Sequence, residues 1–176
     1  MTIYRPAEDS FLMKEVLINE LKDKNITCLE IGSGSGIQIR TLIDLGIKPE
    51  NITLTDINPE AIINLKKEFS ISKVINSDLF QKIKEDFDLI VFNPPYLPED
   101  KREPKDSRLA TTGGKEGSEI INRFLKEAKV HLTKEGKIFL LTSSLTKNIN
   151  WEDWKKRKIG EKKIFMEELF VWELTI

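Results

Sequence analysis

The sequence predicts an α/β fold, a doubly wound and mostly parallel sheet with helices on both faces. Two observations predict it. Short apolar runs typical of buried strands alternate with segments whose apolar residues recur at helical spacing. A glycine-rich turn joins the first apolar run to a helix, as in folds that bind a ligand at the edge of a parallel sheet. The 176 residues are expected to form one domain, 1–176, with an N-terminal lead-in helix.

Local patterns indicate the individual elements. Strands are expected at residues 26–31, 52–55, 74–76, 87–92, 138–141, 164–166 and 169–172, the last two as an antiparallel pair. Helices are expected around residues 13–21, 37–45, 59–69, 121–132 and 151–157. Gly46 is placed to end the second helix, and Asn58 and Pro59 to begin the third. Gly136 is expected to stop the fourth.

Composition and charge exclude several classes of protein. The single cysteine, Cys28, and the single histidine, His131, leave no internal disulfide and no metal cluster. Cys28 is expected to pack in the core, and His131 to be a surface residue near a helix C-terminus. No apolar run approaches the roughly 18 residues of a membrane span, and the polar N-terminus is not a signal peptide, so a cytoplasmic protein is expected. A net charge of -1 and a pI near 6.0 give no electrostatic footprint for nucleic acid. The basic run 155–158 is expected to be a solvated face, with Trp151 and Trp154 packed inward.

The glycine loop is the segment Glu30-x-Gly32-x-Gly34-x-Gly36. Glycines let the backbone approach a ligand closely, and the N-terminus of the following helix points at that ligand. The dinucleotide fingerprint is incomplete, because the sixth position counted from the first glycine is Ile37. An NAD-dependent oxidoreductase is further disfavoured because neither tyrosine is followed four residues on by a lysine.

Acidic residues follow the second and third strands. Asp56 lies twenty residues after Gly36, where a carboxylate can accept hydrogen bonds from both hydroxyls of a ribose. Asp78 is placed to accept a hydrogen bond from an exocyclic adenine amine. The first and fourth strands flank the topological switch point of such a sheet. The glycine loop and the end of the fourth strand should therefore face one crevice.

The fourth strand closes in Asn93-Pro94-Pro95-Tyr96. Two prolines remove two backbone donors, so the sheet cannot continue through this corner. The corner presents the Asn93 amide, the Pro94 carbonyl and the Tyr96 ring. Two carbonyl acceptors beside a flat ring suit a planar NH2 group, either a carboxamide or the exocyclic amine of a base. The alternative is a proline-rich turn that merely leaves a core strand.

These motifs together resemble the HemK/PrmC-type class I S-adenosylmethionine-dependent methyltransferases. The segments that carry the resemblance are 30–36, 56–59 and 93–96, and segments 6–12, 113–117 and 121–125 resemble the short archaeal and eukaryotic subclass. Ser10 stands where threonine is common in that subclass and keeps the hydroxyl. The resemblance implies a single-domain Rossmann-like fold with a seven-stranded sheet and an antiparallel C-terminal strand. It also implies methylation of the glutamine in the Gly-Gly-Gln motif of a peptide-chain release factor.

The resemblance further implies the site residues. The residues that would hold the cofactor S-adenosylmethionine are Asp9, Ser10, Glu30, Gly32, Asp56, Asp78, Leu79 and Asn93. Those that would bind the substrate are Asn93, Pro94, Pro95 and Tyr96, of which Asn93, Pro94 and Tyr96 would be catalytic. No metal is expected. For Asp9 and Ser10, the start of a helix is the alternative explanation.

The implied chemistry depends on position and electrostatics. Asn93 Oδ1 and the Pro94 carbonyl would accept the two N–H bonds of an amide, and Tyr96 would pack on its plane. An N6-adenine methyltransferase for DNA or RNA is the main alternative, because the same corner suits a flipped adenine. The slightly acidic pI and the lack of a target-recognition domain disfavour it. A non-catalytic cofactor-binding subunit is disfavoured because the corner is intact.

The resemblance also implies protein partners. A release factor would be the substrate, and a small zinc-binding activator protein would form a heterodimer with the chain, while no membrane contact is expected. The third strand should lie at a sheet edge, where Val74 and Ile75 are available for strand addition unless the neighbouring helix covers them. The long polar segment 97–116 is expected to be a functional or mobile loop.

Overall fold

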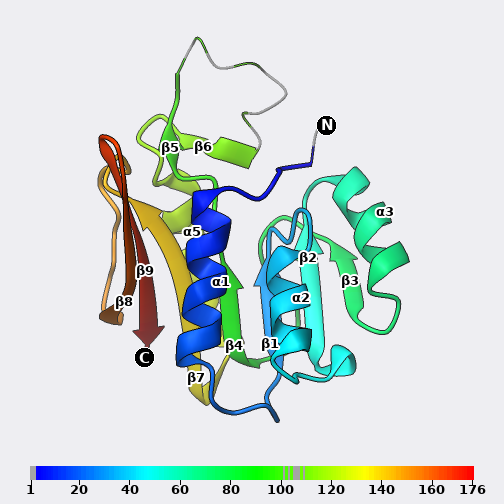
Figure 1. The fold of residues 1–176 in the computed structure, drawn as a ribbon. Helices are drawn as coiled ribbons and strands as arrows, with labels where there is room; N and C mark the ends of the chain where they lie inside the picture. Colours follow the sequence, from blue (N-terminus) through cyan, green and yellow to red (C-terminus); the bar gives the residue numbers. More distant parts are fainter. Residues whose placement is uncertain (1–2, 101, 103, 105–107, 109) are drawn as a thin grey trace.

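The sheet has the predicted doubly wound architecture. The computed structural model describes residues 3–100, 102, 104, 108 and 110–176, and within them a seven-stranded sheet runs in the order β3-β2-β1-β4-β7-β9-β8 (Figure 1). Its strands are β1 (Cys28–Ile31), β2 (Ile52–Asp56), β3 (Lys73–Asn76), β4 (Phe87–Phe92), β7 (Leu132–Ser143), β8 (Lys155–Ile164) and β9 (Glu167–Thr175). Strands β1 to β4 and β7 are parallel, and β9 is antiparallel to both of its neighbours. The predicted fold, with its antiparallel C-terminal strand, is confirmed.

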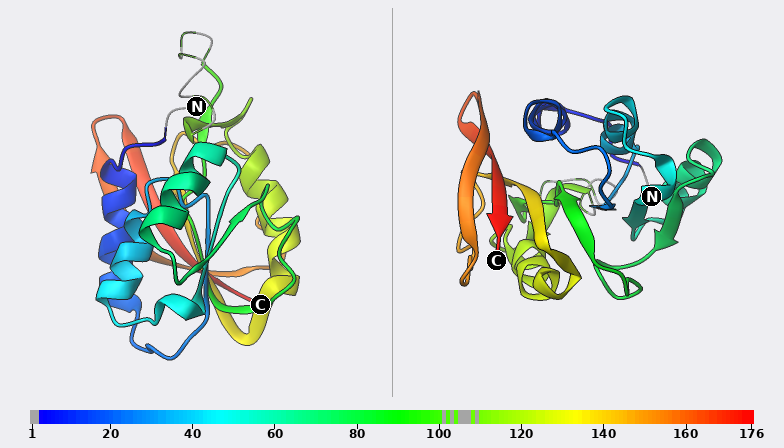
Figure 2. Two further views of the ribbon diagram at one scale, coloured as in Figure 1. Left: turned by 90° about the vertical axis from the view of Figure 1, so that its right-hand side faces the viewer. Right: turned by 90° about the horizontal axis from the view of Figure 1, so that it is seen from below.

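Helices cover both faces of this sheet. They are α1 (Glu8–Glu20), α2 (Ile37–Asp44), α3 (Pro59–Glu68) and α5 (Glu119–Ala128), with short 3-10 turns η1 (Pro49–Asn51) and η2 (Lys129–His131). Seen from below, α1 and α2 lie on one face and α5 on the other (Figure 2). Strand β4 shows why both faces are apolar: Leu89 and Val91 join the core under α1 and α2, whereas Ile90 and Phe92 join the core under α5.

Local signals place several boundaries where the sequence predicts them. The Asn58 side chain accepts a hydrogen bond from the Glu60 amide and caps α3, with Pro59 in its first turn. Gly46 ends α2 with a φ of 97°, and the Ile47 amide donates to the Leu42 carbonyl. Cys28 is fully buried in β1, in line with a structural role.

The predicted helix at 151–157 is wrong. Strand β8 begins at Lys155 and forms the outer edge of the sheet, with the basic run exposed. Trp154 is buried and its Nε1 donates to the Leu125 carbonyl, as an inward-packed tryptophan should. An edge strand carrying charged residues on both faces has no period-two pattern, so its sequence does not indicate a strand.

Two further boundaries differ from prediction. Phe165 and Met166 form the turn between β8 and β9 and are not part of a strand, because β8 starts earlier than expected. Gly136 lies inside β7, whereas the preceding helix ends at Ala128. A Cβ at Gly136 would lie 2.7 Å from the Phe87 carbonyl oxygen. Close backbone contact with β4 therefore accounts for this glycine.

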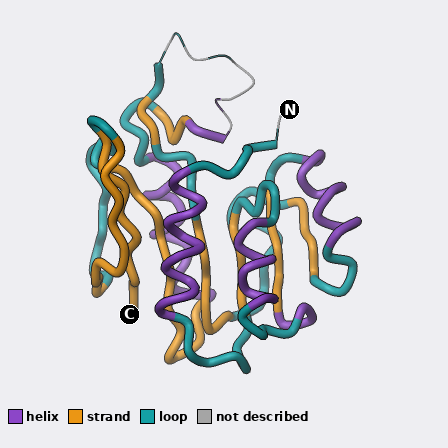
Figure 3. The backbone as a smooth tube through the Cα atoms, viewed as in Figure 1, coloured by secondary structure: helices purple, strands orange, loops and turns teal. Residues whose placement is uncertain are grey.

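The polar segment 97–116 forms one small two-stranded sheet, with one strand from each end of the segment. Strands β5 (Leu97–Pro98) and β6 (Thr112–Gly114) pair with each other above the carboxyl edge of the main sheet (Figures 1 and 3). Residues 101, 103, 105–107 and 109 of the predicted loop lie outside the described residues. Across the described part of the chain, no helix combines the length and the apolar character needed to cross a membrane.

Candidate active site

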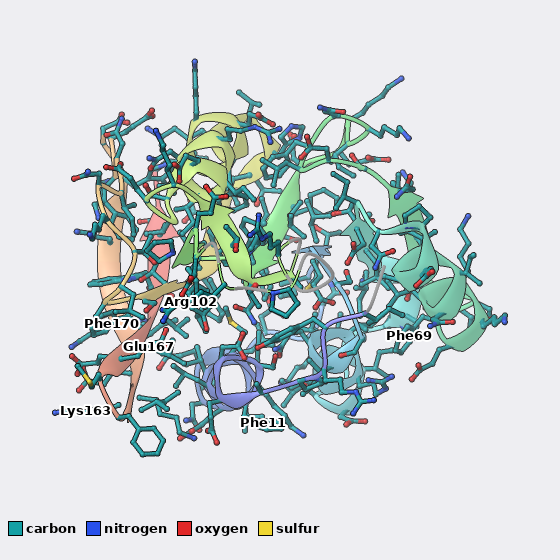
Figure 4. All side chains as sticks on the ribbon, turned by 90° about the horizontal axis from the view of Figure 1, so that it is seen from above. Phe11, Phe69, Arg102, Lys163, Glu167 and Phe170 are labelled. Carbon is teal, nitrogen blue, oxygen red and sulfur yellow. The ribbon has the colours of Figure 1, made fainter. Side chains whose placement is uncertain are left out.

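A cavity of about 220 Å³ opens where β1, β2 and β4 end. Its lining includes ten of the predicted site residues: Asp9, Ser10, Glu30, Gly32, Asp56, Asp78, Leu79, Asn93, Pro94 and Pro95. Tyr96 is not in the lining. Its side chain is half-buried against the cores on both sides of the sheet, and burial raises its pKa. Viewed down onto this edge, Phe69 lies on the α3 side and Glu167 and Phe170 on the opposite β9 side (Figure 4).

Hydrogen bonds to Asp56 fix the conformation of the glycine loop. Asp56 Oδ2 accepts from the Gly34 amide at 2.8 Å, and Oδ1 accepts from the Asn58 amide at 2.7 Å. Gly36 has a φ of 78°, and a Cβ there would lie 2.6 Å from the Phe69 ring. The loop therefore requires glycine for both conformation and space, and its shape depends on the Asp56 carboxylate.

The proline corner is oriented by Asp9, which lies 84 residues away in the sequence. Asn93 Nδ2 donates to Asp9 Oδ2 at 2.9 Å, and the Tyr4 hydroxyl donates to Asp9 Oδ1 at 2.9 Å. A carboxylate only accepts, so this contact sets which end of the Asn93 amide is the oxygen. Asn93 Oδ1 is left buried, with no hydrogen-bond partner among the described residues. A helix start alone does not account for Asp9, which orients the amide of the corner.

Three buried acceptors in the described chain lack a hydrogen-bond donor: Glu30 Oε2, Gln38 Oε1 and Asn93 Oδ1. All three residues line the cavity. An acceptor removed from water without a donor costs free energy, so the cavity suits a ligand with several N–H or O–H donors. The sequence analysis missed Gln38. Its signal is a polar residue on the inward face of α2, one position into the helix that follows the glycine loop.

The cavity is acidic. Asp9, Glu30, Asp56 and Asp78 all line it, and Arg123 is the only Lys or Arg residue in that described lining. Arg123 forms an ion pair of 2.8 Å with Asp78 at the rim, a role that its position in the sequence did not indicate. Such a surface favours a ligand that carries positive charge.

Burial raises the pKa of Glu30 to about 8, with the nearby Asp56 carboxyl as the second cause. Burial also raises the pKa of Asp56, although the hydrogen bonds that Asp56 accepts from backbone amides lower it in part. The two carboxyls are close enough to disfavour each other's charged form, and a ligand that donates hydrogen bonds or brings positive charge would favour ionisation of both.

We expect Glu30 to make the free protein less stable as pH rises. Its pKa is about 8 in the folded chain against an ordinary value of 4.5, so its contribution is fully present below pH 4.5 and lost through pH 8. The loss is on the order of a few kcal/mol. Urea unfolding from pH 5 to pH 8.5 should show a free energy of unfolding that falls with pH in the wild type. The fall should be shallower in Glu30→Gln, where only the raised pKa of Asp56 still contributes to it. Identical slopes would contradict the assignment.

The fold with this sheet order is that of the class I methyltransferases. A solved S-adenosylmethionine-dependent methyltransferase of Bacteroides fragilis, in complex with S-adenosyl-L-homocysteine, shares this fold. It is 17% identical, with a TM-score of 0.63, and the match covers 98% of this chain and 82% of that one. The chain belongs to the methyltransferase small domain family, whose profile matches residues 12–150.

Relatives with known names are methyltransferases that act on glutamine or on release factors. A protein of Methanocaldococcus jannaschii assigned as a protein N5-glutamine methyltransferase is 41% identical over 150 residues, covering 82% of this chain and 74% of the relative. The release factor glutamine methyltransferase of Lactococcus lactis is 30% identical, covering 77% and 54%. The catalytic subunit of the eRF1 methyltransferase of Schizosaccharomyces pombe is 27% identical, covering 82% and 74%. The predicted family is confirmed, and the expected cofactor, S-adenosylmethionine, agrees with these findings.

Proposed function

We propose that this chain transfers a methyl group from S-adenosylmethionine to the side-chain amide nitrogen of a glutamine, in the Gly-Gly-Gln motif of a peptide-chain release factor. The observation that carries the proposal is the buried Asn93 Oδ1, an acceptor without a donor, oriented by Asp9 beside the Pro94 carbonyl. The names of the relatives, which specify glutamine and release factors, support the same reading.

The cavity fits this cofactor. Its carboxylates suit a ligand with a sulfonium and an ammonium group, and the unpartnered oxygens of Glu30 and Gln38 suit hydroxyl and amine donors. The residues that we propose to hold it are Asp9, Ser10, Glu30, Gly32, Asp56, Asp78, Leu79 and Asn93. When bound, S-adenosylmethionine supplies an electrophilic methyl group on a positively charged sulfur.

The chain's own part in the reaction is to hold and polarise the amide. An amide nitrogen is a poor nucleophile because its lone pair is delocalised into the carbonyl. Asn93 Oδ1 and the Pro94 carbonyl accept its two N–H bonds, and Asp9 keeps the Asn93 amide from turning over. These acceptors become more favourable as the nitrogen gains positive charge in the transition state, and the excess proton leaves to solvent. Fixed orientation supplies much of the remaining acceleration.

We propose for Tyr96 a part that differs from the one expected from sequence. Its ring packs into the core and does not line the cavity, and its carbonyl accepts from Thr146 Oγ1 at 2.9 Å. We therefore propose that Tyr96 anchors the proline corner to the loop after β7. In this proposal Pro94 and Pro95, and not Tyr96, pack on the flat face of the substrate amide.

The test of the function is a methyl-transfer assay with three acceptors in parallel: a release factor, its Gln→Ala variant at the Gly-Gly-Gln motif, and an adenine-containing oligonucleotide. Labelled cofactor should modify the intact release factor alone. Label on the oligonucleotide alone would overturn the proposal in favour of an adenine methyltransferase. Label on both release factors would assign a different acceptor residue.

We also infer that the chain works in the cytoplasm as a heterodimer with a small zinc-binding activator. Strand β3 lies at the open edge of the sheet, and Val74 and Ile75 in it are only half-buried. Ile71, directly before β3, is 69% exposed. An apolar open edge accepts an added strand from another chain. The yeast relative, whose name describes it as a catalytic subunit, supports a partner.

Val74→Lys should break this pair. The substitution places a charge in the middle of the proposed docking edge. Cofactor affinity is measured alongside, and an unchanged affinity shows that the cavity is intact. Val130→Lys, at an exposed valine in η2, controls for the added charge and should leave the pair intact. Co-purification of the activator with Val74→Lys at the wild-type ratio would mean that the docking edge is elsewhere.

A further inference from the structure

Gln38 is a buried amide whose orientation is set by one contact. It lies in the first turn of α2, directly after the glycine loop, and is 3% exposed. Its Nε2 donates to the Ser10 carbonyl of α1 at 2.9 Å. Because a carbonyl only accepts, the amide cannot be turned over, and Oε1 is left as an acceptor. Within the described residues, no donor reaches Oε1.

Packing does not explain this residue. The flanking positions of α2, Ile37 and Ile39, are apolar, and a leucine at position 38 would fill similar space without burying an unpaired oxygen. Gln38 also lines the cavity, together with Ser10 and Asp9. A buried acceptor that lines a ligand cavity and has no donor indicates a donor on the ligand.

S-adenosylmethionine has one hydrogen-bond donor group that is not yet assigned to an acceptor, and Gln38 Oε1 is the acceptor that remains. Asp56, with Glu30 beside it, is the proposed acceptor for the ribose hydroxyls, Asp78 for the adenine amine, and Asn93 for the substrate amide. The methionyl arm carries the remaining donor, an ammonium group with three N–H bonds. The region around Gln38 suits that arm, because the N-terminus of α2 has no side-chain cap and the start of a helix favours a negative group, such as the carboxylate beside the ammonium.

Resting on the proposed function, we propose that Gln38 Oε1 accepts a hydrogen bond from the α-ammonium group of the methionyl arm and so selects for ligands that carry it. Gln38 is then a specificity-determining residue of the cofactor site. It holds one end of the ligand and contacts neither the transferred methyl group nor the acceptor amide.

The test compares three ligands by calorimetry: S-adenosylhomocysteine, its decarboxylated analogue, which keeps the amine, and 5′-methylthioadenosine, which lacks the whole arm. Gln38→Leu should weaken the first two by about ten- to a hundredfold and leave the third unchanged, since a hydrogen bond to a charged group is lost. Thr41→Val is the matched control. It removes a buried hydroxyl from the same helix, outside the cavity lining, and should change none of the three affinities.

Each other outcome has a definite meaning. Equal weakening of all three ligands by Gln38→Leu would show that Gln38 only ties α2 to α1, and would overturn the proposal. Weakening of S-adenosylhomocysteine but not of the decarboxylated analogue would assign Gln38 to the carboxylate, and would also overturn it. Failure of the wild-type protein to bind any of the three would contradict the proposed function itself, which separates the two failures.

Discussion

Asn93→Ala should lower the rate of methyl transfer by about a hundredfold or more, with a much smaller effect on cofactor affinity, because seven other residues are also proposed to hold the cofactor. The variant removes the buried Oδ1 acceptor that we propose to hold the substrate amide. Loss of a single preorganised hydrogen bond at a developing charge costs about this much in other enzymes. Single-turnover methylation of a release factor, with saturating cofactor, measures the chemical step directly.

The matched control for this variant is Asn122→Ala. Asn122 lies on α5, outside the cavity lining, and its side chain bonds to the backbone at Asn148 and Asn150. Its loss should leave the single-turnover rate unchanged. A near-normal rate for Asn93→Ala would refute the proposed role of the corner, whatever its effect on substrate affinity.

Asp56→Ala should weaken the binding of S-adenosylhomocysteine by about ten- to more than a hundredfold. Two effects act in the same direction. The carboxylate is the proposed acceptor for the ribose hydroxyls, and it also holds the glycine loop through the amides of Gly34 and Asn58. Calorimetry on the purified variant measures the affinity, and its unfolding temperature reports the loop contribution separately.

Asp153→Ala controls for the loss of an acidic residue. Asp153 is an exposed aspartate that pairs with Lys129 and is not part of the cavity lining, so its removal should not change ligand affinity. If Asp56→Ala loses stability but binds the ligand as the wild type does, then Asp56 shapes the turn after β2 and makes no contact with the ligand.

Strong local signals were sufficient for the parallel part of the sheet. The run 87–92 is long, apolar and closed by two prolines, and β4 has the predicted bounds. The third helix begins where Asn58 and Pro59 predict, because a cap and a fixed φ act within a few residues. Strand-end acidic residues were also readable, since the carboxyl ends of parallel strands meet at one edge of a sheet.

Strands at the edge of the sheet were harder to predict from the sequence. Strand β8 is exposed along most of its length, and its lysines and arginine gain stability from contacts that lie elsewhere in the sequence, such as the pairing of Arg157 with Glu20 and Glu173. No hydrophobic period marks such a strand. Its conformation comes from the ladder that it forms with β9, which is a tertiary contact.

By itself, the sequence determined the fold class, the family and the strand ends at which the site lies, because backbone preferences and motif spacings are local properties. Only the tertiary structure decided which atoms face one another. Asp9 reaches Asn93 across 84 residues, Gln38 is oriented by a carbonyl of another helix, and the half-buried Tyr96 side chain packs against both cores. The orientation of a side-chain amide depends on the partner that packing brings to it, and packing is a property of the whole chain.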